Sequence, residues 1–232
     1  FAGTAGSAGS TNATGAAARF SSPFGLTFDS AGNLVVADYT NGSVRKISPA
    51  GAVTTFAAGL GTTDAVVFDS SGNLFVAGHS ANVIYKINSA GTVSTFATGF
   101  SFPHGLAIDS SNILYVANAG TGTVLKFTPA GAVSTFASGF NVPTGIAIDS
   151  AGYVYVADHG NHAIRKVTPN GATVTLLAGQ IGSAGSSDGA GSAARFNFPT
   201  HLRFDSAGNL FVTDRDNQTI RKITPAGIVT TV

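Results

Sequence analysis

The amino-acid sequence predicts an all-β fold, a β-propeller of five four-stranded antiparallel blades. The first observation is an internal repeat in the 232 residues, marked by the aspartates of one recurring phrase at Asp29, Asp69, Asp109, Asp149 and Asp205. Successive aspartates are 40, 40, 40 and 56 positions apart. A period of about 40 residues is typical of architectures whose units pack against their neighbours. The second observation is that the apolar residues within each repeat have the spacing of strands rather than that of a helix.

The fourth repeat shows the expected strands most clearly. Its apolar and β-branched residues fall in four runs, at residues 146–149, 153–158, 163–168 and 173–177. The turn sequences D-S-A-G, D-H-G-N and T-P-N-G separate these runs, and such residues favour tight reversals of the chain. The second run is nearly continuous in apolar character, which suits a strand that is covered on both faces. We therefore expect each repeat to form a four-stranded meander packed between two others.

We expect a single domain over residues 1–232, with repeats at 1–55, 56–95, 96–135, 136–176 and 177–232. Because the chain holds a whole number of repeats, the five blades are predicted to close into a monomeric ring. The first and fifth repeats each contain a long segment rich in Gly, Ala and Ser, at residues 3–20 and 179–196. These segments are interpreted either as recognition loops or as surface excursions held where Phe20 and Phe196 pack under a blade.

Composition excludes several classes of protein. Hydrophobic residues make up 44% of the chain and charged residues 10%, which argues against disorder. The net charge of +1 gives no reason to expect nucleic acid or a membrane surface as a partner. The absence of cysteine excludes disulfides, thiol catalysis and thiolate metal sites. We expect no cofactor.

The repeated phrase P-x-G-[LI]-[AT]-[IF]-D-S-x-G-N-[LY]-x-V-A-D-x-x-N-x-x-[IV]-R-K-[IV] resembles the NHL repeat, in its bacterial form, along the whole chain. The resemblance implies a β-propeller. NHL propellers usually have six blades, so an incomplete six-bladed ring is the alternative to five closed blades. Repeats of this composition resemble those of bacterial exported or cell-surface proteins, and the resemblance implies an extracellular or cell-surface location.

All five histidines are predicted on one face of the propeller. His79, His159 and His162 fall in loops between the second and third strands, and His104 and His201 fall at the start of a first strand. The repeats place Phe24, Asp64, His104, Thr144 and Thr200 at one register position, around the expected central channel. Convergent polar groups around a pocket are the usual form of a small-ligand site. The candidate ligand-binding residues are Asp64, His104, Thr144, Thr200, His201, His159 and His162.

The function predicted from these residues is non-enzymatic recognition of a protein, peptide or glycan on this loop face. One alternative is a metal-dependent hydrolase or lyase centred on His104 with Asp64 and His201. The peptidyl-amidating lyase, a related propeller, takes its zinc histidines from three P-H motifs, and only His104 stands in such a motif here. We therefore expect no metal ligand and no catalytic residue. A second alternative is a structural scaffold or engineered repeat protein without a ligand.

Overall fold

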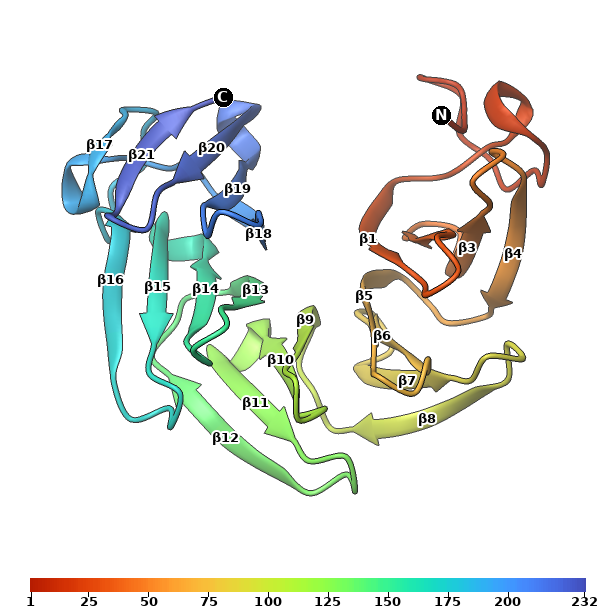
Figure 1. Cartoon of the computed structure of the whole chain (residues 1–232), viewed down its shortest axis with the longest axis horizontal. Coiled ribbons are helices and arrows are strands. Elements are labelled where there is room, and N and C mark those ends of the chain that lie inside the picture. The colour runs from red at the N-terminus through yellow and green to blue at the C-terminus, as the bar shows by residue number, and fades with distance from the viewer. The chain divides into compact units, whose positions relative to one another are not determined.

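The computed structural model describes all residues from Phe1 to Val232. The fold is all-β, and it is the five-bladed propeller of four-stranded antiparallel sheets that the sequence predicts (Figure 1). The chain divides into two compact units, Phe1–Asn112 and Ile113–Val232. No helix is long and apolar enough to cross a membrane.

The first unit contains two complete blades and the first strand of a third (Figure 1). Within each blade, antiparallel strands follow one another in chain order, as in the predicted meander. The elements are η1 (Gly15–Ala17), β1 (Pro23–Phe28), β2 (Leu34–Asp38), β3 (Ser43–Ile47), β4 (Val53–Ala58), β5 (Thr63–Phe68), β6 (Leu74–Gly78), β7 (Val83–Ile87), β8 (Val93–Thr98) and β9 (Pro103–Ile108).

The second unit contains the remaining strands of the third repeat and the fourth and fifth blades. Short 3-10 turns connect the second and third strands of these blades. The elements are β10 (Leu114–Asn118), η2 (Ala119–Thr121), β11 (Thr123–Phe127), β12 (Val133–Ser138), β13 (Pro143–Ile148), β14 (Val154–Asp158), η3 (His159–Asn161), β15 (Ala163–Val167), β16 (Val174–Gly179), β17 (Gly189–Ala190), η4 (Gly191–Ala193), β18 (Pro199–Phe204), β19 (Leu210–Asp214), η5 (Arg215–Asn217), β20 (Thr219–Ile223) and β21 (Ile228–Thr231).

The expected repeat boundaries fall inside strands rather than between blades. The boundary at 55/56 lies within β4, and those at 95/96, 135/136 and 176/177 lie within β8, β12 and β16. The sequence repeat is therefore offset by a few residues from the structural one, since each blade begins at the residue that opens its first strand.

The recurring D-S-x-G-N turns are built as their sequence predicts. The Oδ1 atom of Asp29 accepts hydrogen bonds from the backbone N–H groups of Ala31 and Asn33. The carboxylates of Asp69, Asp149 and Asp205 accept the equivalent bonds in their own turns. These side chains replace the missing backbone partners of a tight reversal, which accounts for their recurrence.

The long Gly/Ala/Ser segments pack along the outer strands of the first and fifth blades. In the fifth blade the segment contributes β17, which pairs with β21 and extends that sheet to five strands. In the first blade Thr14 forms an isolated bridge with Ala52. Phe196 is fully buried among residues of the fourth and fifth blades. The structure thus supports the interpretation as surface excursions packed on the blades.

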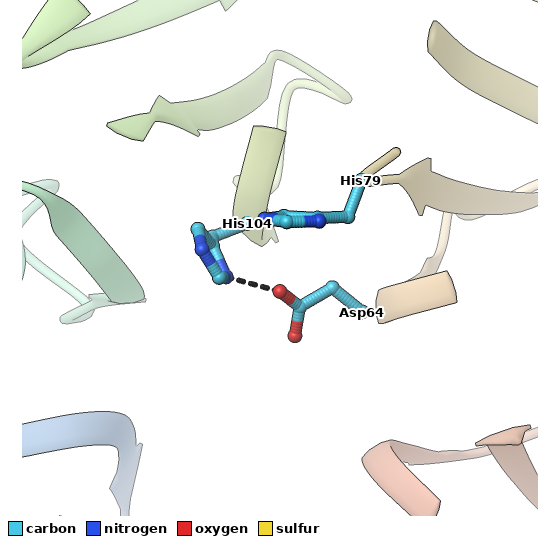
Figure 2. Close-up of side chains that lie close together, drawn as sticks. All are labelled: Asp64, His79 and His104. Carbon is cyan, nitrogen blue, oxygen red and sulfur yellow. Dashed lines mark ion pairs between the residues drawn. The ribbon is translucent and has the colours of Figure 1, made fainter. Parts of the chain in front are cut away.

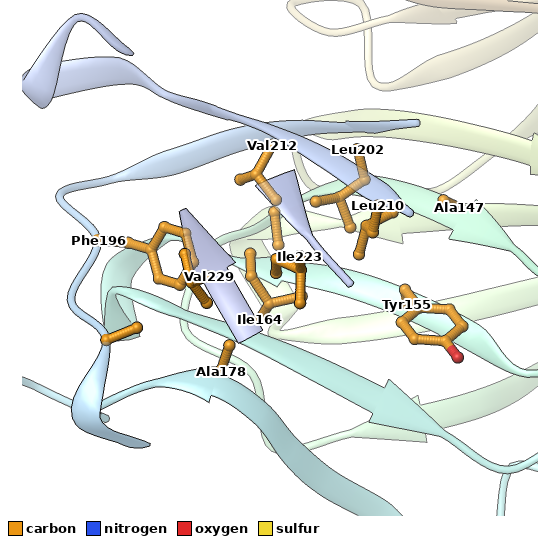
Figure 3. Close-up of a cluster of buried hydrophobic side chains, with 12 residues drawn as sticks. Ala147, Tyr155, Ile164, Ala178, Phe196, Leu202, Leu210, Val212, Ile223 and Val229 are labelled. Carbon is orange, nitrogen blue, oxygen red and sulfur yellow. The ribbon is translucent and has the colours of Figure 1, made fainter. Parts of the chain in front are cut away.

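The interior of the second unit shows how neighbouring blades share a core (Figure 3). Ile164 and Tyr155 of the fourth blade pack against Leu210, Ile223 and other residues of the fifth blade. Close backbone approach is also required at the first strands, where a Cβ on Gly145 would lie 2.3 Å from the carbonyl oxygen of Thr200. Glycine at this position lets the first strands of successive blades come together.

Candidate functional site

Three polar side chains from consecutive blades meet in the first unit (Figure 2). Asp64 lies in β5, His79 directly follows β6, and His104 lies in β9. One possible ligand atom from each residue lies within 4.8 Å of those of the other two. Asp64 and His104 are close because β5 and β9, the first strands of successive blades, are neighbours. His79 joins them because the loop that follows β6 lies next to these two strands.

Asp64 is the buried member of this cluster, with 2% of its surface exposed. Its Oδ2 atom faces Nδ1 of His104 in an ion pair and has no hydrogen-bond partner of normal geometry. No arginine or lysine pairs with this carboxylate, whereas the buried Asp38 and Asp214 each pair with an arginine. A buried carboxylate with so few donors is costly unless a cation compensates for it.

His79 is the third member of the cluster and comes from the same blade as Asp64. Its ring lies 4.5 Å from that of His104, centroid to centroid, at an interplanar angle of 60°. Burial lowers the pKa of His79 below its ordinary value of 6.5, and the nearby His104 lowers it further while Asp64 opposes the change. His79 is therefore a neutral imidazole near pH 7, with a nitrogen lone pair that can bind a proton, a metal or a ligand.

A row of aromatic rings leads to this cluster. The Phe24 and Tyr39 centroids are 5.9 Å apart, and Tyr39 lies 6.1 Å from His79. On the other side, the ring of Phe102 is 5.2 Å from that of His79. Phe24 and Phe102 are 39% and 50% exposed. The row thus offers an accessible apolar surface beside a buried carboxylate.

Phe102 also has an uncommon backbone conformation, with φ of 52°. Ser22, Val142 and Phe198 precede the first strand in their own repeats and have φ values of 51–54°. Positive φ is rare for bulky and β-branched residues, and such strain often occurs near functional sites. Four of the five repeats share this conformation, so it is part of the backbone geometry that precedes a first strand. It does not identify a functional site at Phe102.

Two predicted site residues in the second unit form hydrogen bonds with neighbouring strands. Thr144 is 8% exposed, and its hydroxyl lies 3.3 Å from the carbonyl oxygen of Pro199 and 3.1 Å from that of Thr200. Thr200 is equally buried, and its hydroxyl lies 2.6 Å from that of Thr213. These threonines join first strands and their neighbours.

The histidines of the second unit are also held by the fold. His159 places Nδ1 3.1 Å from the carbonyl oxygen of Pro199. His162 accepts a hydrogen bond from the backbone N–H of Phe198 at 3.2 Å, so its Nδ1 is the unprotonated atom. His201 lies in β18, and its backbone N–H donates to the hydroxyl of Thr213. The rings of His159 and His162 both lie against Phe198.

The structure therefore joins two of the predicted site residues, Asp64 and His104, and adds one that the prediction left out. The sequence predicts His79 in a loop, but its position next to His104 depends on the packing of one repeat on the next. Reading the loop of one repeat together with the first strand of the following repeat would have found it. His201, which the metal-dependent alternative combined with His104, belongs to the second unit.

One carboxylate and two imidazoles at this separation support a limited set of chemical roles. They can hold a proton between Asp64 and a histidine, bind a polar group of a ligand, or coordinate a cation. The aromatic row adds a surface for apolar groups. The fold and these side chains define a repeat propeller with a polar and aromatic cluster on its loop face.

The chain belongs to the teneurin NHL domain family, whose model matches residues 4–186. This confirms the predicted NHL repeat. A search of curated proteins by sequence finds no match.

Several solved structures share the fold. An auxiliary nutrient binding protein from Bacteroides thetaiotaomicron is 19% identical with a TM-score of 0.80, over 91% of this chain and 57% of that one. A streptogramin B lyase is 15% identical with a TM-score of 0.73, over 92% of this chain and 69% of that one. A chain of a nidogen/laminin complex is 18% identical with a TM-score of 0.74, over 87% of this chain and 75% of that one. This chain spans less than two thirds of the nutrient binding protein, and these identities show the fold alone.

Proposed function

We propose that this chain is a non-enzymatic binding module that recognises a protein, peptide or glycan through the loop face of the propeller. The observation that carries the proposal is the aromatic row of Phe24, Tyr39, His79 and Phe102, which leads to the buried carboxylate of Asp64. Ring faces bind apolar side chains or the C–H faces of sugars, and a few convergent polar groups orient the ligand.

The row differs from the parts of the repeat that build blades. The lysines at one register position of the third strands recur in all five repeats, and Lys46, Lys86 and Lys126 lie over phenylalanine rings at 4.8–5.8 Å. In contrast, the register position of Tyr39 holds His79, Ala119, His159 and Arg215 in the other repeats. Variation in loops on a uniform scaffold is the pattern expected of a recognition surface.

The comparisons lend this proposal general support. Propellers of the same fold are described as nutrient binding proteins and as a component of a nidogen–laminin complex, and others are described as lyases. We propose a monomeric module outside the cell, with Asp64 and His104 as the principal polar contacts. Thr144, Thr200, His201, His159 and His162 remain proposed contacts of a second patch in the fourth and fifth blades. Nucleic acid and membranes are not among the proposed partners.

The test is a screen of the untagged chain against an immobilised glycan panel and a displayed peptide library, with 1 mM EDTA present to remove any metal dependence. Binders should lose about 30-fold in affinity in Phe24→Ala and Tyr39→Ala, equivalent to the roughly 2 kcal/mol of an interface hot spot. Val133→Ala is the matched control, since Val133 is 58% exposed on the outer strand β12. Binding that survives both ring variants, or that is lost equally in the control, would contradict the proposal.

A further inference from the structure

The strongest unexplained feature of the molecule is the carboxylate of Asp64. It is almost completely buried, and its Oδ2 atom faces Nδ1 of His104 without a hydrogen bond of normal geometry. The comparison with Asp38 shows what a buried aspartate ordinarily receives in this fold. Asp38 accepts from the Ser21 backbone N–H, the Asn41 amide and the Arg45 guanidinium. Asp64 has two imidazoles in place of these donors.

The two imidazoles are arranged as a ligand set. Nδ1 of His104 faces the carboxylate, and His79 approaches from its own loop so that all three residues point toward one another (Figure 2). Imidazole nitrogen and carboxylate oxygen are the common ligands of zinc and of neighbouring transition metals. Three protein ligands with one position left for water or another molecule are a frequent arrangement for zinc.

The spacing permits an ion with modest side-chain movement. Ligand atoms around a tetrahedral zinc ion, with bonds of 2.0–2.1 Å, lie about 3.3 Å apart. The three ligand atoms here lie within 4.8 Å of one another. The Asp64–His104 pair would open and His79 would approach, so that the cation would lie between the carboxylate and the two imidazoles. The buried negative charge would then be compensated by the ion.

The other repeats do not provide this combination at the equivalent positions. The first repeat has Phe24 and Tyr39 there, and the fourth has Thr144 and His159. The nitrogen Nδ1 of His159 is already within hydrogen-bond distance of the Pro199 carbonyl oxygen. The ligand set therefore depends on substitutions specific to the second and third repeats and is no general property of the blade.

We propose that Asp64, His79 and His104 form a site for one divalent transition-metal ion of the zinc class. The inference shares Asp64, His79 and His104 with the proposed recognition function but does not require it. Zinc titration needs no ligand on the aromatic row, so either proposal can fail without the other. It revises the expectation from the sequence alone that the chain has no metal ligand, and the residue that revises it is His79. A bound ion would leave at least one coordination position open beside the aromatic row.

The first experiment measures zinc binding to the untagged full chain after dialysis against EDTA. Titration with ZnCl₂ against a chromophoric chelator should give one site per chain. His79→Ala and Asp64→Asn should each lose more than about 100-fold in affinity, the upper range for loss of a mere outer-shell partner. His159→Ala, the same loop position in the fourth repeat, should bind zinc as the parent does. Circular dichroism of each variant confirms that it is folded.

A second variant keeps the proposal testable if a ligand-removing change disturbs the fold. The chain has no cysteine, so His79→Cys introduces a single thiol. With Co²⁺ as the probe, this variant should show a thiolate-to-cobalt charge-transfer band that the parent and an equivalent His159→Cys variant lack. Binding of zinc by none of the folded proteins would overturn the site. So would zinc affinity that persists in both ligand variants, or a Co²⁺–thiolate band in His159→Cys alone.

Discussion

Removal of the Arg45 guanidinium tests how the first blade holds its long N-terminal segment. Arg45 and Asp38 are both fully buried, and their Nη1 and Oδ2 atoms are 2.9 Å apart. The same guanidinium donates to the carbonyl oxygens of Arg19 and Thr11 and to the side chain of Asn12. One side chain thus neutralises a buried carboxylate and fastens the segment that covers the blade.

Arg45→Leu leaves Asp38 buried without its counter-charge, and we expect the free energy of unfolding to fall by about 3–5 kcal/mol. The double variant Asp38→Asn/Arg45→Leu introduces the residues that the third repeat has at these positions, Asn118 and Leu125. The blade of that repeat forms with two uncharged residues there. It removes the stranded charge but still loses the donors to the covering segment. At roughly 1 kcal/mol for each net hydrogen bond, it should lose only about 1–3 kcal/mol.

The assay is urea unfolding of the parent, the single variant and the double variant, followed by circular dichroism. The matched control is the pair Asp158 and Arg165, which occupies the same register position in the fourth repeat but holds no long segment. Nη1 of Arg165 lies 3.2 Å from Oδ2 of Asp158, and the arginine side chain is 15% exposed. Arg165→Leu should be less destabilising than Arg45→Leu. If Arg45→Leu changed the free energy of unfolding by less than about 1 kcal/mol, or if the double variant were no more stable than the single, the reasoning would be refuted.

Three further predictions concern the turns and the loop face. Asp149→Ala removes the acceptor for two backbone N–H groups, so it should cost about 1–2 kcal/mol in urea unfolding and leave ligand affinity unchanged; lost binding at an unchanged melting temperature would contradict this. Although burial opposes the change, hydrogen bonds from Asn33 and the charge of Lys46 lower the pKa of Asp29 to about 2. Because the pKa of Asp29 in the folded protein is below the ordinary 3.8, the ionised carboxylate stabilises the fold above pH 3.8, and this stabilisation is lost as the pH falls toward 2. Between pH 3.8 and 2, the melting temperature of Asp29→Asn should therefore depend less on pH than that of the parent protein. An equal pH dependence of the two proteins would contradict this prediction. His162→Asn should change the free energy of unfolding by no more than about 0.5 kcal/mol, since Asn82 accepts the equivalent hydrogen bond from Phe102 in its own repeat. His162→Ala removes this acceptor at a residue with φ of 55°, and it should cost about 1–2 kcal/mol in the same urea assay. Equal stabilities of the two variants would show that the His162–Phe198 hydrogen bond does not stabilise the fold.

The fold could be predicted because its determinants are local and repeated. The turn aspartates bond within four residues, and the strands between them have the composition and length that strands require. The strand β17 could not be predicted, because Gly189 and Ala190 have low strand propensity and are held by pairing with β21. Tertiary pairing there overrides the local preference.

The buried ion pairs show a signal that was present in the sequence. Arginine in the third strand occurs only in repeats whose second strand ends in aspartate, as in Asp38 with Arg45 and Asp214 with Arg221. The second repeat has Gly78 with Tyr85, and the third has Asn118 with Leu125. Variation that is correlated among the repeats of one chain therefore predicts which side chains meet across a blade. The contact between His79 and His104 was harder to predict because it joins different repeats.

The candidate site lies where one repeat departs from the common construction. In the first, fourth and fifth repeats an aspartate at the end of the second strand holds the backbone ahead of the first strand, as Asp38 holds Ser21. The second repeat has Gly78 there, and its chain is held instead by reciprocal bonds between Thr62 and Ser80. Thr62 also lacks the positive φ found at that position in the other repeats. Departures from a regular local pattern are expected at functional sites. The altered hydrogen bonding beside Asp64 and His79 is therefore a reason, independent of the ligand chemistry, to place the functional site where the second repeat meets the third.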